Sequence, residues 1–166
     1  MNDPSPPATP SLSPARRARA LLERCPVGIL STILRDESAT PYGSLVTFAV
    51  SHDGDVVLLL SKLAEHSRNL EAEPRASLLV SESFGEPGTD PLAMGRLTVL
   101  GKVEPCRQDE LDADRAAILA RHPSSERTLG FADFGLYRLR IERARIIGGF
   151  GAMSWIWARA WREAWA

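Results

Sequence analysis

The fold is decided by residues 45–70, which read LVTFAVSHDGDVVLLLSKLAEHSRNL. Two apolar runs, Leu45 to Val50 and Val56 to Leu60, are separated by a segment that contains the turn His52-Asp53-Gly54-Asp55. An Asp-Gly turn between apolar runs is typical of a β-hairpin. We therefore predict that the two runs are the arms of one hairpin and that the second arm delivers Ser61 to the edge of a sheet.

A short helix is expected directly after this hairpin. Leu63, His66 and Leu70 fall at helical spacing, and Pro74 ends the pattern. The spacing therefore predicts a helix that ends at about Glu71.

The start of this helix has the composition of an anion site. Exposed backbone N–H groups and a partial positive charge of roughly half a unit favour an anion at a helix start. Ser61 and Ser67 offer hydroxyl donors, Arg68 a planar pair of donors, and Lys62 a point charge. One interpretation is a phosphate-binding corner. The other is an ordinary capped surface helix with solvated charges, because Ser, Arg and Asn are common at helix starts.

Composition restricts the class of protein. A chain of 166 residues with 44% hydrophobic content can bury one sizeable core, and its net charge of -1 lacks the basic excess of a nucleic-acid binder. No apolar run approaches the roughly 20 residues that cross a bilayer, and the start lacks the pattern of a signal peptide. We expect no membrane or nucleic-acid partner and a cytoplasmic location. Cys25 and Cys106 are too few and too far apart for a disulfide framework or a zinc pair, so no metal site is expected.

The remaining pattern alternates strands with few helices. Strands are expected at residues 27–33, 45–50, 56–60, 75–81, 96–103, 136–141 and 144–147, the last two joined by Glu142-Arg143, and further helices at residues 14–22 and 108–122. This order excludes the strand-helix alternation of a doubly wound sheet, and closure into a small antiparallel barrel would remove the sheet edges. The sequence predicts a mainly β, α+β fold: a six- to seven-stranded antiparallel barrel with flanking helices.

Both ends of the chain are expected to differ from the main domain, residues 15–155. Residues 1–14 are rich in Pro, Ser and Thr and predict a disordered tail. Residues 156–166 predict a Trp-rich helical tail in which Trp157, Trp161 and Trp165 share one face. That face is expected to pack on the barrel or across a dimer; a membrane-surface helix and a wall of the substrate pocket are the alternatives.

Five ordered motifs resemble those of a known family. They are PYGSLV at 41–46, LSKLAEHSRNL at 60–70, EPRASLL at 73–79, GRLTVLG at 95–101 and GGFG at 148–151. In this order and spacing, between about Cys25 and Trp155, the chain resembles the FMN-binding split barrels related to pyridoxamine 5'-phosphate oxidase, and within them the haem-utilisation (HugZ-like) branch.

The resemblance implies a homodimer of split barrels with FMN at the subunit interface. Position by position, it implies that the cofactor-binding residues are Ser44, Leu45, Val46, Ser61, Lys62, Ser67, Arg68, Asn69 and Arg96. Ser61, Ser67, Arg68 and Asn69 resemble the phosphate clamp, in which Asn69 replaces a cation, so Lys62 or Arg68 would supply the charge. Ser44, Leu45 and Val46 resemble the strand that faces the flavin ring. Arg96 stands where the oxidases have a glutamine that reaches the cofactor from the other subunit.

Departures from the oxidases limit what the resemblance implies. The strand Ser44 to Ala49 lacks their basic residue, and Trp161-Arg162 is followed by Glu163, so a substrate phosphate has no evident partner and pyridoxamine-phosphate oxidation is disfavoured. The three histidines, His52, His66 and His122, are each expected to be structural or solvated rather than ligands of haem iron.

These observations predict a flavoprotein, namely an FMN-dependent oxidoreductase that acts on an unidentified small molecule. Haem and F420 are alternative cofactors. A non-catalytic flavin- or haem-binding module and a HugZ-like haem-degrading protein are the alternative functions. No residue stands out as an obligatory acid or base, because the flavin itself supplies the redox chemistry.

Overall fold

The computed structural model describes residues 12–36, 38–82, 88, 90, 93–148 and 152–166. The strands are β1 Val27–Ile33, β2 Pro41–Val50, β3 Val56–Ser61, β4 Arg75–Ser81, β5 Gly95–Pro105, β6 Phe134–Gly148 and β7 Met153–Trp157. The α-helices are α1 Pro14–Arg24, α2 Glu65–Ala72, α3 Leu111–Arg121 and α4 Ala158–Glu163, and two short 3-10 helices cover Pro123–Glu126 and Thr128–Gly130. Most of the expected disordered tail, residues 1–11, and three residues of the last motif, 149–151, lie outside the described residues.

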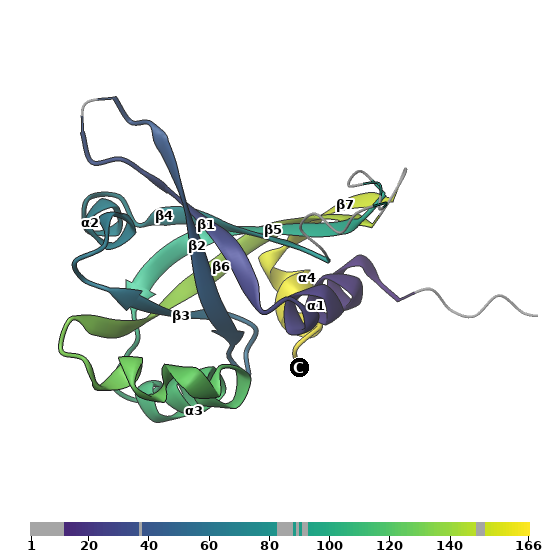
Figure 1. Cartoon of the computed structure of the whole chain (residues 1–166). Helices are drawn as coiled ribbons and strands as arrows, with labels where there is room; N and C mark the ends of the chain where they lie inside the picture. Colours follow the sequence, from purple (N-terminus) through teal and green to yellow (C-terminus); the bar gives the residue numbers. More distant parts are fainter. Residues whose placement is uncertain (1–11, 37, 83–87, 89, 91–92, 149–151) are drawn as a thin grey trace, which may run out of the picture.

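The seven strands form one antiparallel sheet that closes on itself. Neighbouring strands follow the order β3-β2-β1-β4-β5-β6-β7, and β3 also pairs with β6. The first six strands therefore make a barrel, and β7 is an additional strand beside the far end of β6 (Figure 1). The predicted antiparallel barrel with flanking helices is confirmed.

The hairpin predicted from the opening stretch is present. β2 pairs with β3 from Phe48↔Leu58 to Val50↔Val56, and the connecting turn contains Gly54 with φ +87°. A Cβ at position 54 would collide with the ring of Trp165, so glycine is required there both for its backbone conformation and for its lack of a side chain.

The barrel interior is apolar and continuous with the inner face of α1. Strand β1 alternates half-buried and buried positions along its whole length, as expected for a strand with one face on a core. The largest fully buried apolar side chains of the strands include Phe48, Leu58, Leu78, Leu97 and Leu139. From α1, Ala18, Leu21 and Leu22 join the same cluster, whereas α3 packs Ile118 against Ala49 and Val57.

The prediction of two short strands joined by Glu142-Arg143 was wrong. Residues 134–148 form one strand of 15 residues, and its register against β5 shifts at one point. Leu100 pairs with Arg143 and Gly101 pairs with Ile141, which leaves Glu142 as the extra residue of a β-bulge. A Cβ on Gly101 would collide with the carbonyl oxygen of Arg140, so the bulge depends on glycine in the partner strand. A polar pair inside an apolar run marks a bulge here instead of a turn.

The C-terminal residues are not the continuous helix that the tryptophan spacing suggested. Trp157 ends β7, and the helix α4 begins only at the next residue. Trp161 is fully buried and its Nε1 donates to the carbonyl oxygen of Gly54 at 2.9 Å, while the ring of Trp165 lies 6.2 Å from that of Trp161. Packing of this segment on the barrel is therefore confirmed for Trp161 and Trp165, but Trp157 is not part of their face.

A buried ion network joins α3 to the barrel. Arg138 on β6 is fully buried, and its guanidinium donates two hydrogen bonds to the carboxylate of Asp114, each at 2.7 Å. The same guanidinium lies 3.1 Å from Glu110 and 3.3 Å from Asp53. Because a buried cation without a partner is costly, these carboxylates are what permits an arginine at this position.

The network continues to the C-terminal helix. Arg140 donates to Glu110 at 2.9 and 2.7 Å and to Asp55 at 3.2 Å. Arg162 on α4 donates to Asp55 at 2.7 Å and to the carbonyl oxygen of Asp53 at 2.7 Å.

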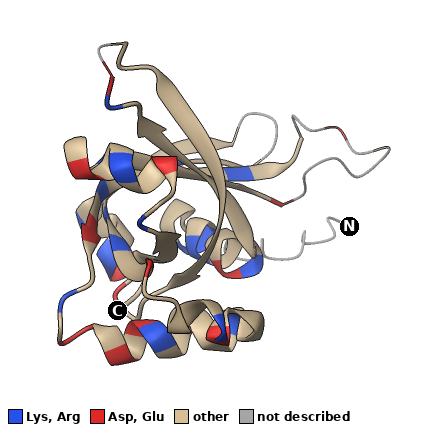
Figure 2. Ribbon diagram, turned by 60° about the vertical axis from the view of Figure 1, so that its left-hand side comes forward, with Lys and Arg blue, Asp and Glu red and all other residues tan. Residues whose placement is uncertain are grey.

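Charged residues of both signs are interspersed along the helices around the barrel (Figure 2). No described helix has the length and apolar content that a membrane span requires.

We expect Trp161→Ala to lower the free energy of unfolding by about 3–5 kcal/mol, because it leaves a cavity and removes the hydrogen bond to Gly54. Trp157→Ala is a matched control four residues earlier, and should cost less than about 1 kcal/mol because its ring is exposed. Urea denaturation followed by circular dichroism measures both. Equal losses for the two variants would contradict the packing of α4 described above.

Glu110 is expected to make the fold sensitive to acid. Hydrogen bonds from Arg140 hold the pKa of Glu110 at about 2, below the ordinary 4.5. The folded state thus resists protonation, so the stabilisation is present above about pH 4.5 and is lost as the pH falls toward about 2. Glu110→Gln should flatten the dependence of unfolding free energy on pH within this window.

The control for this prediction is Glu73→Gln. The pKa of Glu73 is also lowered to about 2, by a hydrogen bond from Arg75, but this pair is exposed and local in sequence. A local pair persists in part in the unfolded chain, so its removal should change the pH dependence less. A larger effect for Glu73→Gln than for Glu110→Gln would refute the role of the buried network.

Candidate functional site

The residues of the predicted phosphate corner lie at the β3–α2 connection, where the hydroxyls of Ser61 and Ser67 both donate to other protein groups. Ser61 Oγ donates to the carboxylate of Asp133 at 2.8 Å and accepts a hydrogen bond from the N–H of Leu63 at 3.2 Å. Ser67 is buried, and its Oγ donates to the carbonyl oxygen of Ser61 at 2.7 Å. Both side chains therefore fix the β3–α2 connection, and Asp133 adds a negative charge beside Ser61.

Asn69 has a structural position in the same corner. It is fully buried, its Nδ2 donates to Thr32 Oγ1 at 3.1 Å, and its Oδ1 accepts from the N–H of Arg35 at 3.3 Å. These bonds attach α2 to β1 and to the residues that follow it. Both ends of the Asn69 amide are therefore engaged inside the protein.

The two cations of the corner point outward. Arg68 is exposed and lies 3.9 Å from the carboxylate of Glu65, one turn earlier on α2. Lys62 is exposed, and its Nζ lies 3.5 Å from the carbonyl oxygen of Ala132. The corner thus brings Ser61, Lys62 and Ser67 together, with Arg68 at its rim.

The other predicted cofactor residues lie on two separate strands. On β2, Val46 faces the core, Leu45 faces outward with 69% of its surface exposed, and Ser44 Oγ lies 3.2 Å from Nδ1 of His66. Arg96 lies on β5 opposite Ile147, whereas Ser61 lies opposite Phe134 at the other end of β6. A single chain therefore does not bring Arg96 to the corner, and a contribution from the second subunit of a homodimer stays a prediction.

His66 has one nitrogen without a partner. Its Nδ1 faces Ser44, while Nε2 is buried and makes no hydrogen bond to the residues that the structure describes. Burial lowers the pKa of His66 below its ordinary 6.5, so the ring is neutral at physiological pH. A neutral imidazole with an open nitrogen has the chemistry of a metal ligand, but this nitrogen is covered in the folded chain. His122 Nε2 lies 2.9 Å from the carbonyl oxygen of Phe48, and His52 is exposed in a turn.

Neither thiol is suited to catalysis. Burial and a hydrogen bond to Asp114 raise the pKa of Cys106 to about 12, and burial raises the pKa of Cys25. Both are therefore protonated at neutral pH, as expected for plain thiols. Within the described residues, no cluster of His, Cys, Asp and Glu side chains is suited to a metal ion.

A second group of candidate residues lies on β6 and β7. Trp155 and Trp157 stack with ring centroids 6.5 Å apart, and they remain 48% and 61% exposed. The guanidinium of Arg143 lies 5.4 and 5.9 Å from these two rings, and that of Arg145 lies 5.4 Å from Trp155. We call these four side chains the Trp–Arg ladder. Their strands pair so that Arg143 is opposite Trp157 and Arg145 is opposite Trp155.

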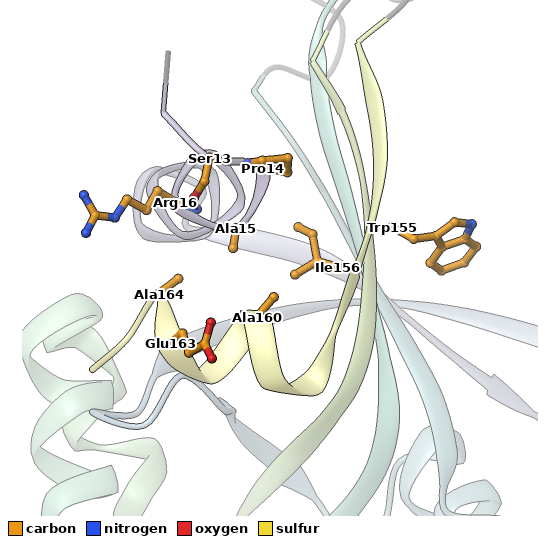
Figure 3. A pocket seen from close by; sticks show the side chains of 9 residues that line it. All are labelled: Ser13, Pro14, Ala15, Arg16, Trp155, Ile156, Ala160, Glu163 and Ala164. Atoms are coloured by element: carbon orange, nitrogen blue, oxygen red, sulfur yellow. Dashed lines mark hydrogen bonds between the residues drawn. The ribbon is translucent and has the colours of Figure 1, made fainter. Parts of the chain in front are cut away.

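The ladder faces away from the helices. Figure 3 shows Ile156 pointing toward α1 and Trp155 pointing to the opposite side of β7. The cavity between α1 and α4 measures about 270 Å³, and Ala15, Ala160 and Ala164 are among its lining residues. Small ligands generally occupy clefts of about 300–1,000 Å³, so this cavity is a gap between helices rather than a cofactor site.

Comparison with known proteins identifies the family. The family profile described as "CREG, beta-barrel" matches residues 9–163. The chain belongs to this CREG beta-barrel family. The resemblance to split barrels with haem-handling relatives is thereby confirmed.

Three relatives of this CREG-family chain have names that refer to haem. A heme binding protein from Mycobacterium smegmatis is 35% identical with a TM-score of 0.85, and the match covers 93% of this chain and 62% of that one. The chloroplastic heme oxygenase HOZ from Arabidopsis thaliana is 33% identical over 138 residues, which is 83% of this chain and 41% of HOZ. HutZ, the heme storage protein of Vibrio cholerae, is 27% identical with a TM-score of 0.64, and the match covers 76% and 88% of the two chains. The chain thus spans less than two thirds of the first two relatives.

Sequence reasoning missed the ladder and Asp133. The signal for the ladder was the period of two in Trp155-Ile156-Trp157 and in Arg143-Ala144-Arg145, which places like residues on one face of a strand. The helical spacing of Trp157, Trp161 and Trp165 concealed it. Asp133 carried no local signal, because it reaches Ser61 only through the pairing of β3 with β6.

Proposed function

We propose that this chain of the CREG beta-barrel family binds haem. The observation that carries the proposal is the match to the mycobacterial heme binding protein, at 35% identity over 93% of this chain. HOZ and HutZ, whose names also refer to heme, support the same cofactor. The proposal therefore favours haem over the FMN that the motif resemblance suggested.

The geometry of the corner agrees with this preference. A flavin phosphate placed at Ser61 would meet the carboxylate of Asp133, which already accepts the Ser61 hydroxyl at 2.8 Å. The negative charges of the phosphate and of Asp133 would repel each other. Ser67 has no spare hydroxyl proton, because its hydroxyl donates to the carbonyl oxygen of Ser61. Of the side chains predicted for the clamp, the exposed Arg68 and Lys62 are left to attract the phosphate, and exposed ion pairs contribute only about 0–1 kcal/mol each.

The residues present fit a porphyrin. Haem offers a flat aromatic ring, two carboxylates and an iron, and it needs apolar contact area and cations. The described surface provides exposed aromatic rings with arginines beside them, whereas the free nitrogen of His66 is covered. Bound haem would supply the redox and oxygen chemistry. The task of the protein residues would be to hold the ring, neutralise its carboxylates and limit access of water.

Titration with haemin tests the proposal. We expect saturable binding of one haemin per chain with a shifted Soret band, and FMN titrated under the same conditions should bind more weakly or not at all. Equilibrium dialysis of both compounds measures the two affinities. A purified chain that binds FMN tightly and gives no saturable haemin signal would reject haem as the cofactor and restore the flavin interpretation.

Haem breakdown is a second candidate function, favoured by the 33% identity to HOZ. It needs electrons and oxygen from outside the protein. We expect a chain that only stores or carries haem to keep its Soret band when ascorbate is added in air. Loss of the band with formation of an open-chain tetrapyrrole would instead establish breakdown by the protein. This reaction should continue in the presence of catalase, whereas catalase should block the breakdown of free haemin in a control without protein.

A further inference from the structure

The Trp–Arg ladder exposes an unusual amount of aromatic surface. Trp155 is about half exposed and Trp157 is more than half exposed, although tryptophan has the largest apolar surface of any side chain. The opposite face of β7 already contributes Ile156 to the core, so the strand does not need these rings for its own packing. Exposed aromatic surface of this kind generally marks a binding site.

The charges of the ladder are also different from those elsewhere on β6. Arg138 and Arg140 on the same strand each pair with two or more carboxylates. Within the part of the chain that the structure describes, Arg143 and Arg145 form no ion pair and instead lie against the tryptophan rings. Two guanidinium groups are thus held beside stacked aromatic rings, with no ion-paired carboxylate among the described residues.

The shape of this surface suits a flat ligand. β6 and β7 are adjacent antiparallel strands, and the row of the ladder continues across the sheet through Thr98 and Leu100 on β5. Leu100 is opposite Arg143, and Thr98 is opposite Arg145, so one face of the sheet combines apolar groups and cations. The strands that carry the ladder extend from the barrel in Figure 1, where β7 is labelled away from α2 and α3.

We propose that the Trp–Arg ladder is the haem-docking surface, with the porphyrin ring stacked on Trp155 and Trp157 and its carboxylates bound by Arg143 and Arg145. This inference rests on the proposed function. It assigns a place that is distinct from the Ser61 corner and from His66. Stacking on the tryptophan rings supplies apolar contact area for a flat ligand. The planar guanidinium groups can bind carboxylates with two parallel hydrogen bonds.

Two double variants test this assignment by haemin titration. Trp155→Ala with Trp157→Ala removes the rings, and Arg143→Gln with Arg145→Gln removes the charges. Each should weaken haemin binding about tenfold or more, because several contacts are lost at once. Thermal unfolding followed by circular dichroism should change little, since these side chains lie outside the core.

The matched controls come from a second aromatic and arginine pair. Phe131 is 46% exposed and the guanidinium of Arg127 lies 5.9 Å from its ring, but both residues precede β6. Phe131→Ala and Arg127→Gln should leave haemin affinity within about twofold of the unchanged chain. Haemin dimethyl ester gives a control on the ligand, because it lacks the two charges. It should bind the unchanged chain as weakly as haemin binds the arginine variant.

Each outcome supports or overturns the assignment. Failure of the unchanged chain to bind haemin rejects the proposed function and this site with it. If the unchanged chain binds haemin and both ladder variants bind equally well, haem binding stands but the ladder is not its site. Loss of binding in His66→Ala with retention in the ladder variants would move the site to α2. A change of oligomeric state in the tryptophan variant without loss of haemin affinity would instead assign the ladder to contact with a second copy.

Discussion

The architecture of this protein rests on the pairing of β3 with β6. It runs from Val56↔Leu139 to Ser61↔Phe134 and converts an open sheet into a closed barrel. Closure removes two sheet edges whose unpaired backbone groups would otherwise face water or another chain. The same pairing places Asp133 beside Ser61, so the chemistry of the predicted phosphate corner follows directly from it.

The bulge at Glu142 divides β6 into two parts that differ in one neighbouring strand. Before the bulge, the strand lies between β3 and β5 and belongs to the barrel. After it, the strand lies between β5 and β7 and carries Arg143 and Arg145. Because a bulge changes the local twist of a strand, one strand supplies both a barrel wall and an extended face outside it.

Arginines on these two parts of β6 have opposite roles. Arg138 and Arg140 lie among Asp114, Glu110 and Asp55, where their charges are matched and hold α3 and α4 to the barrel. Burial without such partners would be strongly unfavourable, so this network is structural. Arg143 and Arg145 keep their charges at the surface, where aromatic rings accompany them and an anionic ligand can reach them.

Much of the fold was predictable because its signals are local. The Asp-Gly turn gives the β2–β3 hairpin, Pro74 ends the helix before β4, and the period of apolar residues gives β1 and α3. The β6 strand was not predictable in this way, since Glu142-Arg143 looks like a turn unless the partner glycine, Gly101, is known to permit a bulge. The prediction of one helical face for Trp157, Trp161 and Trp165 failed for a related reason. A spacing of four fits a helix, but the backbone of β7 is held extended by its pairing with β6.

The positions of most strands, the β2–β3 hairpin and the presence of hydroxyls and cations after β3 could be predicted from the sequence, because each depends on residues close together in the chain. Only the tertiary structure decided what those groups do. Ser61 is bound to a carboxylate 72 residues away, Asn69 is enclosed against Thr32, and two tryptophans and two arginines meet across neighbouring strands. These contacts depend on which strands lie side by side and on closure of the barrel, and the local spacing of residues does not specify which strands pair.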